Sequence, residues 1–372
     1  KILSRIVGQP KTIKKINRDV IKNIIKDNGP ISKPEIADIT KLSLVTVNKV
    51  VEHLLNKNMI KESGMSESTG GRRAQLFEYN GDLANIIVLY YHKNSYLGAI
   101  SNIIGEIKYT KEFKLRTDDY ENSIEDTYNA IDSLLSYSDN REIKAIGIGV
   151  PGVVKDGVIS NIPNIPSWED LNLKGILEDK YKCTVCIEND VNLTIIGIYE
   201  DIFKDKIKNM VLVYIGDGIG SGIIINEQLF KGATNFAGEL SYLKTNKYYR
   251  ANDEVSKYKR SFEKDINELK NHIREQKKDI SVLKEALINT LVDGFINLLC
   301  ILNPEVLIIQ TDELSVNDID KIITSIKDNI SQENMPKIIK LRDEKIHSIN
   351  GVVTLCLIET ISSYSVFNKR GN

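Results

Sequence analysis

The chain has 372 residues, of which 41% are hydrophobic and 27% charged, which is typical of a soluble globular protein with about two or three domains. Its 23 glycines, 8 prolines and 4 cysteines exclude collagen-like and disulfide-rich classes. No run of about 18 apolar residues occurs and no basic-then-apolar leader opens the chain, so we expect a cytoplasmic protein without a membrane span.

The charge is distributed unevenly. Residues 1–80 hold 15 Lys and Arg against 8 Asp and Glu, a balance of +7, whereas the remaining 292 residues hold 35 against 43, a balance of −8. A small basic module joined to a larger acidic body indicates two parts with different partners, and a polyanion would suit the basic part. A lysine-rich solvated surface is the alternative explanation.

The first 60 residues predict three helices. Apolar residues recur at a spacing of three and four over residues 12–26, which indicates an amphipathic helix that a Gly-Pro pair ends. Ser32 and Glu35 have the spacing of a capping box for a short second helix, whose Ile36 and Ile39 would face inward. Helix, short helix, tight turn and helix within about 45 residues is the pattern of a helix-turn-helix.

A hairpin after the third helix completes a winged helix-turn-helix. Two short strands, at 59–62 and 75–79, flank a glycine-containing stretch whose tip carries two arginines. A guanidinium there can reach a phosphate or the minor groove, and polar residues near the start of the third helix can reach major-groove base edges. A solvated helix face is the alternative for the helix residues. The candidate DNA contacts are Ser43, which also caps the third helix, Thr46, Asn48, Lys49, Arg72 and Arg73.

The remainder of the chain alternates strands and helices, which predicts an α/β fold with ligands at strand ends and loops. The segment 248–278 is highly charged, and we expect an exposed helix there that contacts a partner. Strands are expected at 85–89, 97–101, 106–113, 143–150, 184–187, 210–215, 223–225 and 306–309, and helices at 124–136, from about 191, and at 280–302, 318–329 and 352–362.

Five segments in order resemble the ROK family of sugar kinases and sugar-responsive repressors, which has a two-lobed actin-like, hexokinase-like fold. The repressor branch, which includes xylose-operon and N-acetylglucosamine-operon repressors, also carries an N-terminal helix-turn-helix, so the resemblance extends over nearly the whole chain. The segments are GIGVPG (147–152), NIPNIPSW (161–168), ENDVN (188–192), GDGIGSG (216–222) and GATNFAGEL (232–240), supported by NPEVLI (303–308).

The resemblance implies a sugar site between the lobes. A glycine at a strand end permits close backbone approach, and short amide and carboxylate side chains can grip a polyhydroxyl ring. Asp190 matches the position of the kinase base, and a helix cap is the alternative role for Asn189 and Asp190. The candidate ligand-binding residues are Gly152, Asn164, Asn189, Asp190, Glu239 and Tyr242.

The chain departs from the kinase pattern where a nucleotide would bind. The glycine-rich phosphate loop of the family is replaced by the bulky segment 90–96, YYHKNSY, which offers no cradle of backbone N–H groups. The glycine pair expected after the late strand reads Gln310 and Thr311. The GDGIGSG segment keeps its glycines but can equally serve as a tight turn. We therefore expect no kinase activity, no cofactor and no catalytic residue.

The structural zinc of many relatives is also not expected. Tyr242 stands where the family places a His ligand, and no cysteine lies between Cys186 and Cys300. Cys183 and Cys186 lie three apart in a strand, so their side chains would point to opposite faces. Tyr242 could donate a hydroxyl group in place of the His, or fill the pocket.

We predict a DNA-binding transcriptional regulator, a repressor of sugar uptake or catabolism genes. Residues 1–80 would be the winged helix and 81–372 a sensor, with lobe one at about 81–195 plus the C-terminal helix and lobe two at about 196–350. The expected partners are an operator in double-stranded DNA, a sugar or sugar phosphate effector, and further copies of the chain in a homodimer or tetramer. A sugar kinase with an accessory DNA-binding module, and a regulator whose body binds a protein, are the alternatives.

Overall fold

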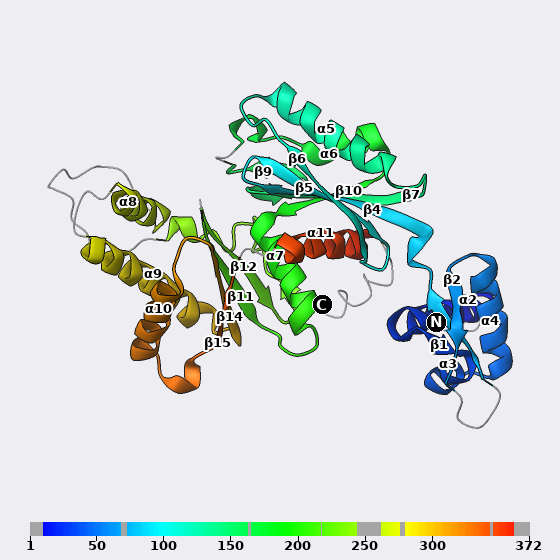
Figure 1. Ribbon diagram of the computed structural model, residues 1–372. Helices are drawn as coiled ribbons and strands as arrows, with labels where there is room; N and C mark the ends of the chain where they lie inside the picture. Colours follow the sequence, from blue (N-terminus) through cyan, green and yellow to red (C-terminus); the bar gives the residue numbers. More distant parts are fainter. Residues whose placement is uncertain are drawn as a thin grey trace, which may run out of the picture.

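The computed structural model describes residues 10–67, 73–162, 165–216, 218–243, 262–275, 280–342 and 345–360. An N-terminal module leads into two lobes, each built on a five-stranded sheet (Figure 1). The predicted Arg72 and Asn164 fall outside the described residues, as do parts of the charged segment 248–278.

The N-terminal module packs three helices against a three-stranded sheet of order β1-β3-β2. The capping box is confirmed, because the Ser32 hydroxyl accepts from the Glu35 backbone and the Glu35 side chain accepts from Ser32. Ile36 is fully buried as expected, but Ile39 is 51% exposed, so its inward orientation was wrong. The second helix has two turns, and only one of its faces reaches the core. The elements are α2 (Pro10–Asn28), β1 (Ile31–Ser32), α3 (Lys33–Thr40), α4 (Leu44–Asn56), β2 (Ile60–Met65) and β3 (Gln75–Tyr79).

Lobe one, as we name the first large sheet with its covering helices, has strand order β10-β7-β4-β5-β6. Helices α5 and α6 cover one face, and α11 covers the other (Figure 1). Strands β4, β7 and β10 are parallel, so their carboxyl ends meet at one edge. The elements are η1 (Gly81–Leu83), β4 (Ala84–His92), β5 (Ser95–Asn102), β6 (Ile107–Lys114), α5 (Tyr120–Ser136), β7 (Glu142–Val150), β8 (Val153–Lys155), β9 (Val158–Ser160), η2 (Pro166–Trp168), α6 (Leu173–Tyr181), β10 (Thr184–Asn189) and α11 (Lys345–Thr360).

Lobe two has strand order β13-β12-β11-β14-β15, with α8, α9 and α10 on one face. The GDGIGSG segment is mostly strand and not a loop, because β12 begins at Ile219. In 248–278, the described part forms α8, which buries Phe262, Ile266 and Leu269 and is therefore not a fully exposed helix. The elements are η3 (Tyr199–Phe203), β11 (Met210–Ile215), β12 (Ile219–Ile225), β13 (Gln228–Leu229), η4 (Leu240–Tyr242), α8 (Phe262–Arg274), α9 (Ile280–Leu302), β14 (Val306–Thr311), α10 (Val316–Asn329), η5 (Gln332–Asn334) and β15 (Lys337–Leu341).

Helix α9 has the length and apolar composition to cross a membrane, with a mean hydropathy of 1.6. Its most apolar window is 56% buried inside the protein, where it packs against the sheet of lobe two. Burial of this kind is what a core helix of a globular lobe requires, so its composition is weak evidence for a membrane span.

Helix α7 (Asp190–Ile198) connects the two lobes. Its Leu193 belongs to the core under lobe one, while Ile195 and Ile198 belong to the core under lobe two. It crosses α11 so closely that a Cβ added to Gly351 would lie 1.8 Å from the backbone oxygen of Leu193. Helix α7 is therefore packed against both lobes and leaves no room for a side chain at its crossing with α11.

Candidate functional site

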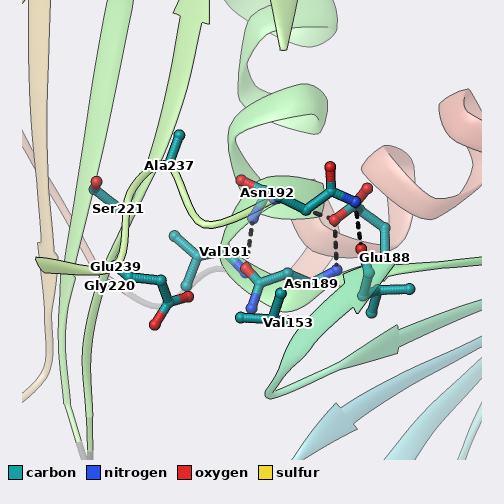
Figure 2. Close-up of a pocket in the computed structure, with 11 residues that line it drawn as sticks. Val153, Glu188, Asn189, Val191, Asn192, Gly220, Ser221, Ala237 and Glu239 are labelled. Carbon is teal, nitrogen blue, oxygen red and sulfur yellow. Dashed lines mark hydrogen bonds between the residues drawn. The ribbon is translucent and has the colours of Figure 1, made fainter. Parts of the chain in front are cut away.

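A cavity of about 30 Å³ lies between the lobes, where the carboxyl ends of β7 and β10 face the 235–239 segment of lobe two (Figure 2). Glu188, Asn189 and Asn192 line it from one side, and Ser221 and Glu239 from the other. Carboxylate and amide side chains from both lobes line it. Three contacts between the lobes, described below, border it, and we call this arrangement the closed cleft.

Asn189 is engaged as the N-cap of α7. Its side-chain oxygen accepts hydrogen bonds from the backbone N–H groups of Val191 at 3.0 Å and Asn192 at 3.1 Å. Its amide nitrogen donates to the backbone oxygen of Gly152 at 3.1 Å. Both ends of the amide therefore fix the backbone at the strand-to-helix turn. The capping alternative is realised, and Gly152 is placed beside Asn189.

Asp190 is the first residue of α7, and its carboxylate accepts from the Val191 backbone N–H at 2.9 Å. It does not belong to the residues that line the cavity, whereas its neighbour Glu188 does. Glu188 was not singled out from the sequence, although it opens the ENDVN motif. Its carboxylate is 4% exposed and receives hydrogen bonds from the Asn189 backbone N–H at 2.9 Å and the Asn192 side chain at 3.1 Å.

Lys231 pairs with Glu188 across the cleft. The Lys231 Nζ lies 3.0 Å from Glu188 Oε2, and Lys231 directly precedes the GATNFAGEL motif on the lobe-two side. A second contact across the cleft runs from the Asn235 amide to the backbone oxygen of Val154, at 2.5 Å. Sequence reasoning missed both residues, because neither contact is visible until the two lobes are brought together.

Glu239 forms a third connection. The Asn161 amide donates to Glu239 Oε2 at 3.3 Å, and the Tyr242 hydroxyl donates to Asn161 Oδ1 at 3.3 Å. Burial, reinforced by the negative charge of Glu263, raises the pKa of Glu239 above its usual range. Tyr242 is 56% exposed, so it does not fill the cavity.

The place of the missing phosphate loop is a tight hairpin turn. Lys93 and Asn94 have φ of 46° and 59°, the left-handed pair of a two-residue β-hairpin turn. The Tyr91 hydroxyl donates to Asn94 Oδ1 at 3.0 Å, and Tyr90, Tyr91 and Tyr96 are at most 7% exposed. Three buried rings and a closed turn leave no loop of backbone N–H groups for a triphosphate.

The glycines of GDGIGSG have a packing role. A Cβ on Gly222 would lie 2.6 Å from the Ile195 side chain, so this glycine lets α7 rest on β12. At the turn before β12, the Lys270 Nζ of α8 donates to the Gly216 backbone oxygen at 2.8 Å and lies 2.6 Å from Glu313 Oε2. Helix α8 and its ion pair cover this turn.

The cysteines behave as core residues. Cys183 packs with the core on the α5 face of the lobe-one sheet and Cys186 with the core on the α11 face, as the spacing of three predicts. Among the described residues, no group of three or more His, Cys, Asp or Glu side chains is arranged to hold a metal ion.

The candidate DNA contacts of the N-terminal module lie at the start of α4 and at the hairpin. The Ser43 hydroxyl accepts the Thr46 backbone N–H at 3.3 Å and so caps α4. Lys49 and Arg73 are exposed, and Thr46 and Asn48 are partly exposed. Val45, which sequence reasoning did not select, is 63% exposed in the same turn.

Comparison with known proteins assigns a family to one segment of the chain. The ROK family model matches residues 95–257. This segment is a ROK family domain. It includes all five motifs on which the resemblance rested, from GIGVPG to GATNFAGEL, whereas the supporting NPEVLI segment follows it in the chain.

The ROK domain has repressors among its relatives. The xylose repressor of Caldicellulosiruptor bescii is 29% identical over 247 residues, which cover 64% of this chain and 61% of that protein. The chain thus spans about three fifths of the length of the curated relatives it matches.

Solved structures show the same fold. A ROK family transcriptional regulator, a homologue of the E. coli MLC protein, aligns with a TM-score of 0.73 at 16% identity, covering 96% of this chain and 99% of that one. A ROK glucokinase from Streptomyces griseus, in complex with glucose and AMPPNP, aligns at 0.57 with 18% identity, covering 73% and 99%. The mixed α/β ROK fold is therefore shared by regulators and kinases.

Proposed function

We propose that the protein is a DNA-binding transcriptional repressor whose affinity for its operator is set by a sugar or sugar phosphate in the cleft. The observation that carries the proposal is the combination of an exposed polar and basic turn at the start of α4 with a ROK domain whose phosphate-loop position is a closed tyrosine hairpin. The repressors among its relatives support the same function.

Residues 1–80 serve as the DNA-binding domain in this proposal, with α4 as recognition helix and the β2–β3 hairpin as wing. Thr46, Asn48 and Lys49 would face base edges or phosphates from the capped start of α4, and Arg73 would reach the backbone from the hairpin. Residues 81–372 serve as the sensor. A homodimer or tetramer in the cytoplasm would place two recognition helices on half-sites about one helical turn apart.

The cleft supplies the switch. Lys231, Asn235 and Glu239 of lobe two contact lobe one around the cavity. An effector in the cleft would touch both lobes and would favour one angle between them, and so it would change the separation of the two DNA-binding domains in a dimer. A preference for one lobe geometry of about 1–3 kcal/mol changes operator affinity about 5- to 150-fold.

Phosphoryl transfer is not part of the proposed function. A kinase needs positioned donors around the β- and γ-phosphates, and the tight hairpin at Lys93 and Asn94 stands in the chain where the family has its glycine-rich phosphate loop. ATP-dependent phosphorylation of any sugar above a blank without protein would contradict this part of the proposal.

The test begins with selection of bound duplexes from a random DNA library by the full chain. Fluorescence anisotropy then measures the affinity of the selected duplex as a function of salt. Lys49→Ala with Arg73→Ala should weaken binding and reduce the slope of log K against log salt by about 0.9 for each phosphate that the protein no longer neutralises. The matched control, Lys337→Ala with Arg342→Ala, removes the same charge from exposed positions of lobe two. It should change neither the affinity for DNA nor the salt slope. Equal effects of the two double variants would contradict the assigned interface.

A further inference from the structure

An exposed aromatic pair lies at the rim of the cleft. Phe236 and Tyr242 are 46% and 56% exposed, and their rings meet edge to face with centroids 5.0 Å apart at 62°. Phe236 stands in the chain between Asn235 and Ala237, both of which line the cavity. We call this pair the aromatic platform. Exposed apolar surface bordered by polar groups marks a ligand-binding groove in many proteins.

The platform is connected to the cleft by hydrogen bonds. The Tyr242 hydroxyl donates to Asn161, and the Asn161 amide donates to Glu239. Glu239 lines the cavity (Figure 2). A ligand that engages Glu239 from inside the cleft and extends outward therefore meets the two rings.

The platform is held in place before any ligand arrives. The Tyr242 ring is fixed at its hydroxyl by Asn161 and at its edge by Phe236. The backbone beside Phe236 is fixed by the Asn235 amide, which donates to the Val154 backbone oxygen. Asn161 is itself anchored, because its backbone N–H donates to Glu169 at 2.9 Å. Pre-organisation of this kind lowers the entropy cost of binding.

The chemistry of the site favours a carbohydrate over a purely apolar ligand. A pyranose ring presents C–H groups on its faces and hydroxyl groups around its edge, so it packs on an aromatic face while its hydroxyls bond to amides and carboxylates. The platform offers the aromatic faces, and Asn161 and Glu239 offer the polar partners beside them. The ring faces and the polar groups occur within one short stretch of the rim.

We infer that the effector is a disaccharide or longer oligosaccharide, with one ring inside the cleft and the next ring stacked on Phe236 and bordered by Tyr242. The inference rests on the proposed function, because it names the class of ligand that the proposed sugar site takes. A monosaccharide held inside the cleft leaves the platform exposed to water, whereas a second ring covers it.

The test compares matched pairs of sugars by isothermal titration calorimetry on the full chain: xylose with xylobiose, glucose with cellobiose and with maltose, and N-acetylglucosamine with its β-1,4 dimer. We expect at least one disaccharide to bind about ten-fold more tightly than its monosaccharide, the gain that one aromatic stacking contact supplies. Phe236→Ala should bring that affinity ratio close to one. The melting temperature of the variant confirms that it folds.

Tyr137→Ala is the matched control. Tyr137 is 52% exposed and stacks on Tyr109, but it lies beside the amino end of β4, at the edge of the sheet opposite to the cleft. Tyr137→Ala should leave the ratio of disaccharide to monosaccharide affinity unchanged. Monosaccharides that bind as tightly as their disaccharides, or a ratio that survives Phe236→Ala, would overturn the platform and leave the proposed sensor in place. Absence of binding by every sugar of this panel and by the 6-phosphates of glucose and N-acetylglucosamine would overturn both the platform and the proposed sensor, while the DNA-binding measurement would still stand.

Discussion

The ion pair between Glu188 and Lys231 should stabilise the closed cleft by a measurable coupling energy. The Glu188 carboxylate is 4% exposed and the Lys231 ammonium group lies 3.0 Å away at 39% exposure. At an effective dielectric constant of about 20, two charges about 4 Å apart attract by about 4 kcal/mol, and the half-exposed lysine loses much of that to solvent screening. Glu188 also keeps its hydrogen bonds from Asn189 and Asn192 when Lys231 is removed.

We therefore expect Lys231→Met to lower the free energy of unfolding by about 1–2 kcal/mol, because it leaves a buried carboxylate without its counter-charge. Glu188→Gln keeps the shape and the hydrogen-bonding capacity but removes the charge. The double variant should cost less than the sum of the two single variants, with a coupling energy of about 1 kcal/mol.

Urea unfolding followed by tryptophan fluorescence measures these energies. Trp168 is the single tryptophan of the chain, is fully buried, and donates from Nε1 to the Ser123 hydroxyl at 2.8 Å, so its emission reports the unfolding of lobe one. A coupling energy below about 0.3 kcal/mol, the usual error of additivity, would refute the role of this pair in holding the cleft closed.

Three further predictions concern single positions. Gly351→Ala should destabilise the protein by about 1–3 kcal/mol or more in thermal melting, because the added Cβ would lie 1.8 Å from the Leu193 backbone oxygen. Ser43→Ala should cost about 1 kcal/mol of N-terminal-module stability because the α4 cap is removed, measured by hydrogen exchange of that helix. Glu239→Gln should raise the free energy of unfolding of the ligand-free protein at neutral pH. Burial and Glu263 raise the Glu239 pKa, so the ionised carboxylate destabilises the folded state. That advantage should be full above the raised pKa and vanish below pH ~4.3, whereas sugar affinity should fall. A Glu239→Gln variant that melts at the same temperature as the native protein across this pH range would contradict the desolvated environment of Glu239.

Local signals in the sequence were sufficient for most elements. The caps at Ser32 and Ser43 fix where α3 and α4 begin, because a cap depends on residues three positions apart. The helix predicted at 280–302 agrees with α9 at both ends, because an apolar run of this length is too long for a strand. The helices that were predicted correctly are therefore specified by a cap or an apolar run in their own sequence.

The differences arise where distant segments meet. The sequence predicted the last helix from residue 352, but α11 begins at Lys345 and includes the Asn350–Gly351 pair that resembles a turn. Helix α7 packs against Gly351 too closely for a side chain, which accounts for a glycine in the interior of α11. The Glu188–Lys231 contact joins residues 43 positions apart, so no local pattern could reveal it.

In the proposed function, a sugar in the cleft is coupled to DNA at α4, and coupling of binding free energies must be reciprocal. The most direct measurement is the affinity of the full chain for the selected duplex with and without a saturating saccharide, together with the affinity for that saccharide with and without the duplex. We expect the same factor in both titrations, about 5- to 150-fold. A saccharide that binds in the cleft and leaves the affinity for DNA unchanged would contradict this coupling.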